Sequence, residues 1–438
     1  MKKQHYAKMN LFKEIQLAQK QLAAVIVPTP LLENLSLSKH YNAVVILKRE
    51  DLQAGCSFKI RGVYNKINSL SITEKERGIV CASDGNHAQG VAYCCELLKI
   101  MGKIYLPKNT SKQKLEQIQK FGKEYIKIIL TGDYFEEAYS IALGDASIHR
   151  KAFIHPFDDL KVIAGQATAG LEILEEYQNP IDYVFVPLEG SGLAAGISSA
   201  FKMLSPNTKI IGVTTQENPS LEITNENDPS FDAPKSYLNN ASIKKQDDLT
   251  SNICKENLDD VIKISEGKIC STILKLANNK DTNIEHEGVL SIAALDFYAD
   301  KIKGKNVVCI INGGLKNIEK EAEIKERSLL YDGLVHYFMI QSPQRSEILK
   351  DFISNILGPD DEITHFQFVQ KENYETQSVF IRLETKEPNN IEAIKTKMQA
   401  KEFQFQNLND RNDLFSSNIN LENILWEEKQ DNTASSYV

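Results

Sequence analysis

The chain has 438 residues, of which 42% are hydrophobic and 25% charged, a balance typical of a soluble globular protein. This length exceeds that of one ordinary hydrophobic core, so we expect two or three domains. The formal net charge of −8 disfavours a dedicated nucleic-acid binder or a protein that binds anionic membranes.

The first residues lead into an amphipathic helix and lack the continuous apolar core of a signal peptide, and no run is long enough to span a membrane. The cysteines are odd in number, lie mostly in apolar stretches and have no metal-ligand partner at a suitable spacing. The seven stand at positions 56, 81, 94, 95, 254, 270 and 309. We therefore expect reduced thiols in a cytoplasmic protein without a metal site.

Strands and helices alternate over the first part of the chain. After a helix at 11–24 and a Pro-Thr-Pro turn, buried strands are predicted at 44–47, 78–82, 100–106, 125–130, 153–155, 183–186, 209–213 and 306–311. Helix-length segments between strands predict right-handed βαβ crossovers. The polar span from about 218 to 260 is expected to be a surface excursion. The predicted fold class is α/β, with open, twisted, mainly parallel sheets.

The pattern changes after about residue 330. Strands are predicted at 334–340, 363–369, 378–384 and 403–407, and helices at 345–357 and 391–400. This βαββαβ order is that of a split-βαβ sandwich, too poor in catalytic side chains to be a second enzyme. We expect a catalytic domain at 1–330 with a smaller subdomain at about 45–160, an α+β module at 331–420 and a polar tail at 421–438.

Four turns after predicted strands carry polar groups at the edge where open α/β sheets bind ligands. Lys59 begins a helix behind a buried strand, a setting that desolvates an ammonium and favours imine formation. The turn 83–87, Ser-Asp-Gly-Asn-His, offers donors for a carboxylate, and Gly-Ser-Gly-Leu at 190–193 lets the backbone approach a phosphate. Asn312 can bring a polar group beside a flat ring. Taken singly, each could equally be a solvated lysine or an ordinary tight turn.

Together these turns resemble the fold-type II pyridoxal-phosphate enzymes, whose fold is similar to that of the tryptophan synthase β-subunit, and among them the threonine dehydratases (threonine ammonia-lyases). The resemblance covers about residues 15–420, and its last part looks like the family's ACT-like regulatory domain. The segments that carry it are Lys-Arg-Glu-Asp-Leu-Gln at 48–53, Ser-Phe-Lys-Ile-Arg-Gly at 57–62, Gly-Asn-His-Ala-Gln-Gly-Val-Ala at 85–92, His-Pro-Phe-Asp-Asp at 155–159 and Val-Ile-Ala-Gly-Gln at 162–166.

The resemblance implies a pyridoxal 5'-phosphate cofactor and deamination of L-threonine, or of L-serine, in isoleucine biosynthesis. Lys59 would hold the cofactor covalently and then remove the substrate α-proton. Asn86 would bind the cofactor's 3-hydroxyl and Asn312 its pyridine nitrogen. The implied cofactor-binding residues are Phe58, Lys59, Asn86, Gly190, Ser191, Gly192, Leu193 and Asn312, and the substrate carboxylate would be held by Ser83, Gly85, Asn86 and His87. A dimeric or tetrameric homo-oligomer is also implied.

Several positions depart from the family's pattern where ligands would bind. Asp84, Glu189 and Glu287 add carboxylates near turns that must hold anions, and like charge opposes such binding. Asn312 stands where a serine is usual and Leu315 where an asparagine is usual; the stretch 213–216 reads Val-Thr-Thr-Gln in place of Val-Glu-Pro. An alternative hypothesis is therefore a paralogue with the same fold and weak, altered or lost activity.

Two other interpretations concern the glycine turn and the C-terminal module. Gly-Ser-Gly-Leu-Ala-Ala at 190–195 also fits a dinucleotide-binding pattern, with Glu217 at about the spacing of the acidic residue that binds the ribose. In a dehydrogenase, however, the strand before this turn would begin the nucleotide-binding unit, and here that strand lies far into the chain. The C-terminal module keeps Arg345 and a Gly-Pro turn at 358–359. By the resemblance, we expect it to bind isoleucine as a feedback inhibitor.

Overall fold

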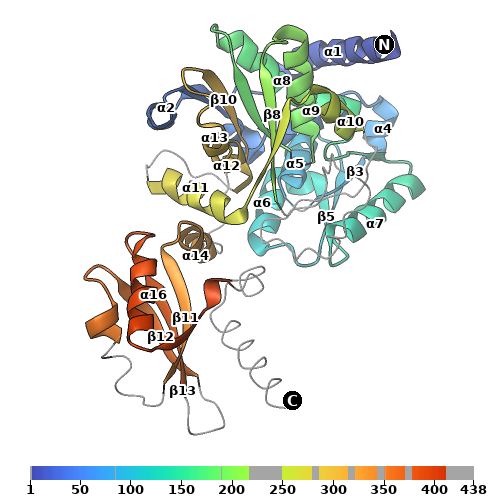
Figure 1. Ribbon diagram of the computed structural model, residues 1–438. Coiled ribbons are helices and arrows are strands. Elements are labelled where there is room, and N and C mark those ends of the chain that lie inside the picture. The colour runs from blue at the N-terminus through green and yellow to red at the C-terminus, as the bar shows by residue number, and fades with distance from the viewer. Residues whose placement is uncertain are drawn as a thin grey trace. The chain divides into compact units, whose positions relative to one another are not determined.

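The computed structural model describes residues 2–83, 85–188, 190–216, 249–278, 286–313, 321–342, 350, 352–369 and 377–410. The chain divides into two compact units (Figure 1). The first comprises Met1–Asp228, Asn239–Ser265 and Thr282–Lys316, and the second Pro229–Leu238, Glu266–Asp281 and Asn317–Val438. Over the described ranges, no helix has both the length and the apolar character that a membrane span requires.

The larger sheet of the first unit has six strands in the order β1-β2-β10-β7-β8-β9. They are β1 (Leu31–Glu33), β2 (Val44–Arg49), β7 (Tyr183–Pro187), β8 (Lys209–Thr215), β9 (Asp260–Ile264) and β10 (Asn306–Ile311). Only β1 pairs antiparallel to its neighbour, and all other pairs are parallel. The central strands β7 and β10 are buried almost throughout, which explains why they are continuous apolar runs rather than alternating ones.

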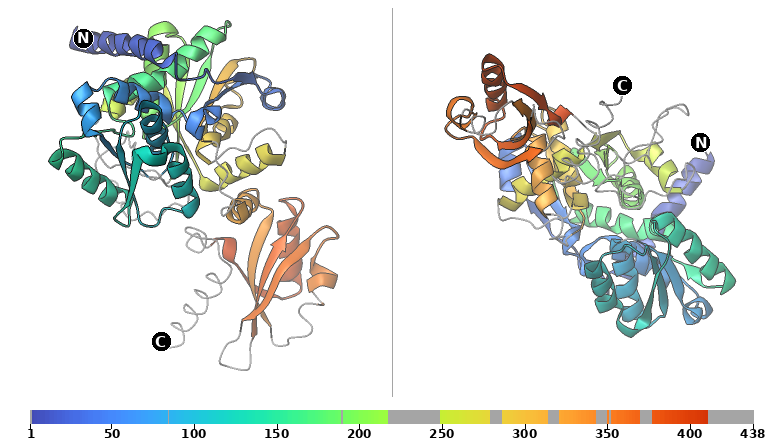
Figure 2. Two further views of the ribbon diagram at one scale, coloured as in Figure 1. Left: turned by 180° about the vertical axis from the view of Figure 1, so that it is seen from behind. Right: turned by 90° about the horizontal axis from the view of Figure 1, so that it is seen from below.

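The smaller sheet has four strands in the order β5-β4-β3-β6, all parallel. They are β3 (Ile79–Ala82), β4 (Gly102–Leu106), β5 (Ile126–Leu130) and β6 (Ala152–Phe153), and they alternate with the helices α5 (Asn86–Leu98), α6 (Lys112–Gly122) and α7 (Phe135–Ile148). Figure 2 shows this sheet and its helices from two further directions. The two parallel sheets confirm the α/β class predicted from the sequence.

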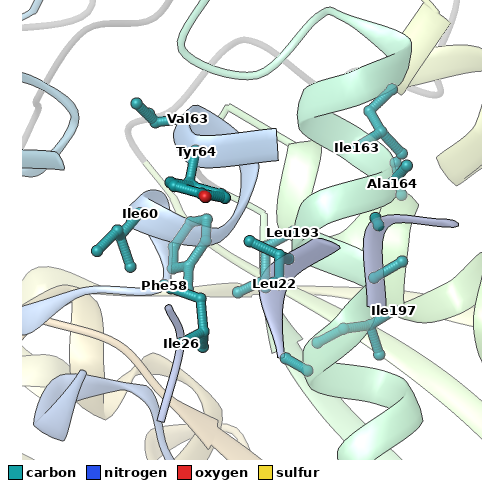
Figure 3. Close-up of a cluster of buried hydrophobic side chains, with 14 of the residues drawn as sticks. Leu22, Ile26, Phe58, Ile60, Val63, Tyr64, Ile163, Ala164, Leu193 and Ile197 are labelled. Carbon is teal, nitrogen blue, oxygen red and sulfur yellow. The ribbon is translucent and has the colours of Figure 1, made fainter. Parts of the chain in front are cut away.

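An apolar cluster joins α1 (Lys2–Leu22), α3 (Lys59–Asn68), α8 (Leu160–Glu176) and α9 (Gly192–Leu204). Figure 3 shows Leu22, Phe58 and Leu193 of this cluster lying beside one another. Full burial of such side chains contributes roughly 1.5–3 kcal/mol each relative to exposure. The crossing of α8 and α9 depends on Gly196, because a Cβ there would lie 2.7 Å from the backbone nitrogen of Ala167. These contacts fix the helix starts that carry the site.

Three parts of the first unit differ from the sequence prediction, and one of them is the strand β9, which was not expected. The short strand β1 and the helix α2 (Leu35–Tyr41) follow the Pro-Thr-Pro turn, where no element was expected. The surface excursion predicted to 260 is wrong for its last part, because α10 (Leu249–Asn257) packs on α9 and buries Cys254. Three polar residues of α10, Thr250, Ser251 and Asn257, are buried as well, and Asn257 Nδ2 donates to Ser198 Oγ at 3.4 Å. Residues 217–248 lie outside the described part. The remaining α-helices in the described part of the unit are α4 (Ile72–Arg77), α12 (His286–Ala293) and α13 (Leu295–Tyr298).

The second unit contains an antiparallel sheet in the order β12-β13-β11-β14. Its strands are β11 (Val335–Ser342), β12 (Glu362–Val369), β13 (Gln377–Glu384) and β14 (Gln404–Asn407). One face packs against α16 (Asn390–Ala400) and a π-helical turn at Phe352–Ile356. On the other face, Tyr337 and Phe380 pack with Leu329 and Leu330 of α14 (Glu321–Tyr331).

This arrangement confirms the predicted α+β module with its βαββαβ order. Within the helix expected at 345–357, the structure describes residue 350 as helical and 352–356 as the π-helical turn; Arg345 and the other residues up to 351 lie outside the described part, as does the tail from 411 onward. Two further elements belong to the same compact unit, namely α14 and α11 (Glu266–Asn278). They pack on each other, and Ser271 Oγ of α11 donates to Asp332 at 2.9 Å just after α14.

Candidate active site

Lys59 is the first residue of α3 and is partly buried. Its Nζ donates to the carbonyl oxygen of Pro156 at 3.3 Å and lies 5.0 Å from the centroid of the Phe58 ring. The contact with Pro156 links the start of α3 to the loop after β6. The amine thus has a defined position instead of extending into solvent, as a surface lysine would.

Ser57 and Asn312 connect the start of α3 to the end of β10. Both are buried, with exposed fractions of 1% and 4%, and Ser57 Oγ donates to Asn312 Oδ1 at 2.9 Å. Ser57 Oγ also accepts a hydrogen bond from the backbone nitrogen of Lys59 at 3.4 Å. The structure therefore brings two predicted site residues, Lys59 and Asn312, together through Ser57. Ser57 stands within a motif of the sequence, but no role at the site was predicted for it.

The turn after β3 is shaped by the hydroxyl group of Ser83. Ser83 Oγ accepts hydrogen bonds from the backbone nitrogens of Gly85 at 3.0 Å and Ala88 at 3.1 Å. The helix α5 begins at Asn86, so the amides of Asn86 and His87 have no acceptor one turn earlier within the helix. Two such amides at a helix start are suited to an anion. Asp84 lies outside the described residues.

His87 is buried in its neutral form. Its Nε2 lies 3.0 Å from the carbonyl oxygen of Ile154, which can only accept, so the proton is on Nε2. Burial, and then the positive charge of Lys59, lower the pKa of His87 to about 3. Nδ1 is consequently an unprotonated acceptor, and it has no hydrogen-bond partner among the described residues.

The glycine turn between β7 and α9 adopts the left-handed backbone region twice. Gly190 has φ +70°, and a Cβ there would lie 2.7 Å from Phe157 Cδ1, so only glycine fits. Ser191 follows with φ 59° and donates its backbone N–H to Leu188 O at 2.8 Å. The backbone nitrogen of Gly192 donates within the turn, to Gly190 O at 2.8 Å.

The unused amides of this turn are those at the start of the helix itself. The first intrahelical bond runs from Ala195 to Ser191, which leaves the amide of Leu193 in the first turn of α9 without an acceptor in the helix. The sequence analysis expected four residues, 190–193, to present amides to a phosphate. Two of these amides already donate inside the turn. Glu189 lies outside the described residues.

The other predicted site residues lie on the same elements. Asn86 is the first residue of α5 and is partly exposed. Phe58 and Leu193 are both buried in the apolar cluster of Figure 3, so Phe58 belongs to the core as well as lying near Lys59. Phe157, which packs on the glycine turn, was quoted within a motif at 155–159 but not predicted as a site residue. The side chain of Glu287 and the whole of Leu315 are not described.

A buried ion-pair network lies directly behind Lys59. Arg61 is fully buried and donates to Glu50 at 2.8 Å and to Glu172 at 2.5 Å; Lys48, also fully buried, donates to Glu172 at 2.7 Å. Although burial alone would lower the pKa of Arg61, the two carboxylates raise it above its ordinary value. The network joins β2, α3 and α8. Sequence could not reveal it, because Arg61 and Glu172 are 111 residues apart.

These groups define what the site can do chemically. A positioned amine can form an imine with a carbonyl compound, two helix starts can hold anions, and a buried amide can donate to a ring. Within the described ranges, no group of three or more His, Cys, Asp and Glu side chains could hold a metal ion. The chemistry fits a phosphorylated aromatic aldehyde and an amino-acid carboxylate.

The comparisons with known proteins agree with this chemistry. Residues 22–313 match the family model described as pyridoxal-phosphate dependent enzyme. The chain belongs to this family. Residues 326–417 match a second model, the C-terminal regulatory domain of threonine dehydratase. The glycine turn lies inside the first match, so the hypothesis of a nicotinamide-dependent dehydrogenase gains no support.

Similar proteins include the L-threonine dehydratase biosynthetic IlvA of Halalkalibacterium halodurans, which is 42% identical over 405 residues, or 92% of this chain and 98% of the relative. The protein of that name from Bacillus subtilis is 40% identical, again over 92% of this chain and over 96% of its own length. Among solved structures, the processed form of threonine deaminase isoform 2 from Solanum lycopersicum is 30% identical, with a TM-score of 0.64 over 74% of this chain and 93% of that one.

The residues present fit pyridoxal phosphate, the cofactor of the family. The left-handed turn at Gly190 leads into a helix start suited to a phosphate, and the amine of Lys59 is suited to an aldehyde. The buried amide of Asn312 supplies a polar group for a ring. No observation in the described part of the site conflicts with this cofactor.

Proposed function

We propose that this chain is a threonine dehydratase that uses pyridoxal phosphate to deaminate L-threonine to 2-oxobutanoate and ammonia in isoleucine biosynthesis. One observation carries the proposal: Lys59 begins α3 with its amine fixed at Pro156, in a chain 40–42% identical to two enzymes of that name over 92% of its length. L-Serine is a second candidate substrate, since it carries the same leaving hydroxyl group.

When bound, pyridoxal phosphate supplies an aldehyde that bonds covalently to amines and a ring that delocalises the electron pair left by loss of the α-proton. Lys59 holds the cofactor and, once the substrate amine has replaced it, accepts the α-proton at Nζ. The carbonyl oxygen of Pro156, 3.3 Å from Nζ, orients the free amine for this step. The neutral imidazole of His87 adds no positive charge beside that amine.

The two helix starts bind the anionic groups. At α9, the amides of the first turn and the helix dipole stabilise the phosphate, with residues 190–193 forming the approach. At α5, the amides of Asn86 and His87 hold the substrate carboxylate, and Ser83 keeps the turn open for it by accepting from Gly85 and Ala88. Each favourable charge placement at a helix start contributes about 0.3–1 kcal/mol, or more when it is buried.

Two asparagines orient the cofactor ring. Asn86 would donate to the 3-hydroxyl group and Asn312 to the pyridine nitrogen. Phe58 anchors the backbone next to Lys59 by packing in the core, which is supported by its burial among the residues of Figure 3. The side chains that orient the cofactor therefore come from rigid element ends rather than from long loops.

The alternative of a paralogue with weak or lost activity gains no support. The relatives reported above carry enzyme names and are 40–42% identical over 92% of the chain. We propose that the carboxylates of Asp84, Glu189 and Glu287 point away from the bound anions.

The C-terminal module is a regulatory domain, and we propose isoleucine as its effector. This assignment is supported by the family model at 326–417 and by the biosynthetic names of the relatives. We further propose a catalytic domain at 1–330 with a subdomain at about 45–160, a regulatory domain at 331–420 and a tail at 421–438. A cytoplasmic homo-oligomer, either a dimer or a tetramer, completes the proposal.

The test is oxo-acid release by the purified chain with pyridoxal phosphate, measured separately with L-threonine and L-serine. Release from threonine that is abolished in Lys59→Ala but kept in Lys112→Ala, a change at an exposed lysine, supports the proposal. No release from either substrate by the cofactor-loaded wild type would refute it.

A further inference from the structure

The buried amide of Asn312 has two chemically different ends. Oδ1 can only accept a hydrogen bond and Nδ2 can only donate. Oδ1 is already engaged, because Ser57 Oγ donates to it at 2.9 Å in a position where both residues are almost fully buried. The end of Asn312 that is left for any ligand is therefore the donor.

We propose that Ser57 is a positioning residue which fixes the amide of Asn312, so that the pyridine nitrogen it meets is held as an unprotonated acceptor. This inference rests on the proposed function, because it requires pyridoxal phosphate to bind at Lys59. It extends that function by assigning a positioning role to Ser57.

The hydrogen bonds of Ser57 set the direction of the amide. Its hydroxyl accepts from the backbone nitrogen of Lys59 at 3.4 Å and donates to Asn312. Rotating the amide by half a turn would bring Nδ2 to the hydroxyl and leave the hydroxyl proton without an acceptor among the described residues. A buried donor without a partner disfavours that state by roughly tenfold or more.

The amide side chain at position 312 is what makes this control necessary. A serine hydroxyl rotates freely and can donate or accept, whichever the ring nitrogen requires. An amide presents one end or the other, and the wrong end would favour a protonated ring nitrogen. In this chain the hydrogen bond from Ser57 keeps Oδ1 of Asn312 engaged, so that Oδ1 is not presented to the ring.

The experiment uses the full chain loaded with pyridoxal phosphate labelled with ¹⁵N in the ring, and reads the ring nitrogen by NMR. Wild type is expected to show the shift of an unprotonated pyridine. Ser57→Ala should move this shift towards that of a pyridinium and weaken cofactor binding by about fivefold, since one hydrogen bond is lost. Ser57→Thr, which keeps the hydroxyl, should restore the wild-type shift. In Asn312→Asp the ionised carboxylate can only accept a hydrogen bond, so this variant gives the reference shift for a pyridinium.

A second background separates positioning from a general structural role. In Asn312→Ser, the hydroxyl has no fixed end, so adding Ser57→Ala should leave the nitrogen shift unchanged. If Ser57→Ala moved the ¹⁵N shift of the ring equally in the wild-type and Asn312→Ser backgrounds, or in neither, the proposal would be overturned. Should Ser57→Ala not fold, Ser57→Cys, a weaker donor, must give an intermediate shift.

The failure of this inference is distinguishable from failure of the proposed function. A visible absorbance band that depends on Lys59, combined with a pyridinium shift in wild type, would refute the role of Ser57 alone. Absence of that band in wild type would refute the proposed function and this inference with it.

Discussion

The buried network behind Lys59 gives a prediction with a calculable size. Glu50 accepts from Arg61 at 2.8 Å through each of its oxygens, and from Thr29 at 2.6 Å. Two cations, Lys48 and Arg61, balance two carboxylates in the network. Glu50→Gln keeps the shape but leaves one buried positive charge uncompensated, which costs about 3–5 kcal/mol.

This loss should appear in thermal unfolding of the cofactor-free chain followed by circular dichroism. At about 2–4 °C per kcal/mol for a domain of this size, Glu50→Gln is expected to lower the melting temperature of the catalytic unit by roughly 6–20 °C. The matched control is Glu116→Gln, which breaks an exposed pair with Lys112 and should change it by less than about 2 °C. All scans use one heating rate, because large chains often unfold irreversibly. Equal shifts for the two variants would refute the role assigned to the network.

Three further predictions concern His87, the glycine turn and the regulatory module. The pKa of the His87 imidazole is near 6.5 in the unfolded state and about 3 in the folded state. Between these values the unfolded state binds more protons, so the free energy of unfolding falls as the pH drops from about 6.5 towards 3. His87→Gln should flatten this limb of a denaturation series, by at most about 4–5 kcal/mol; an unchanged slope would contradict the burial argument. Gly190 has φ +70° and a Cβ there would meet the ring of Phe157, so Gly190→Ala should weaken cofactor binding tenfold or more, a loss of about 1.4 kcal/mol or more. The control is Gly304→Ala, at φ +69° with open space around it, which should leave cofactor binding unchanged. Equal cofactor titration curves for the two variants would contradict this prediction. Glu326→Gln removes an ion pair in which Arg382 donates two hydrogen bonds, at 2.6 and 3.0 Å, so it should lower the stability of the regulatory module by roughly 1.5–3 kcal/mol. The loss should appear as faster amide hydrogen exchange in β11 and β13. Unchanged exchange would count against this prediction.

The sequence predicted the central strands well because they are short, largely apolar runs bounded by turns, whereas the strand β9, which carries Asp260 and Lys263, was missed. The strand at 306–311 has the predicted bounds, and the antiparallel module was predicted from alternation in its strands. The failures have a physical reason as well. The buried face of α10 is mostly polar, and its Asn257 is buried because it donates to Ser198 and Ser199 of α9, which composition did not reveal.

The candidate site was predicted as separate turns, and the links between them needed the structure. Ser57 and Asn312 are 255 residues apart, and His87 and Ile154 are 67 apart, so neither pairing follows from local pattern. A glycine turn at 190–193 was expected from the sequence, but its left-handed conformation was not. The ring of Phe157 that makes glycine obligatory there comes from a distant loop.

The central claim is that Lys59 binds pyridoxal phosphate, and the visible spectrum of the reconstituted chain tests it most directly. Wild type and the surface variant Lys112→Ala should both show an absorbance band of lysine-bound cofactor, and Lys59→Ala should lack it while melting at a similar temperature. A band of equal strength in Lys59→Ala, or no band in wild type at saturating cofactor, would contradict the account.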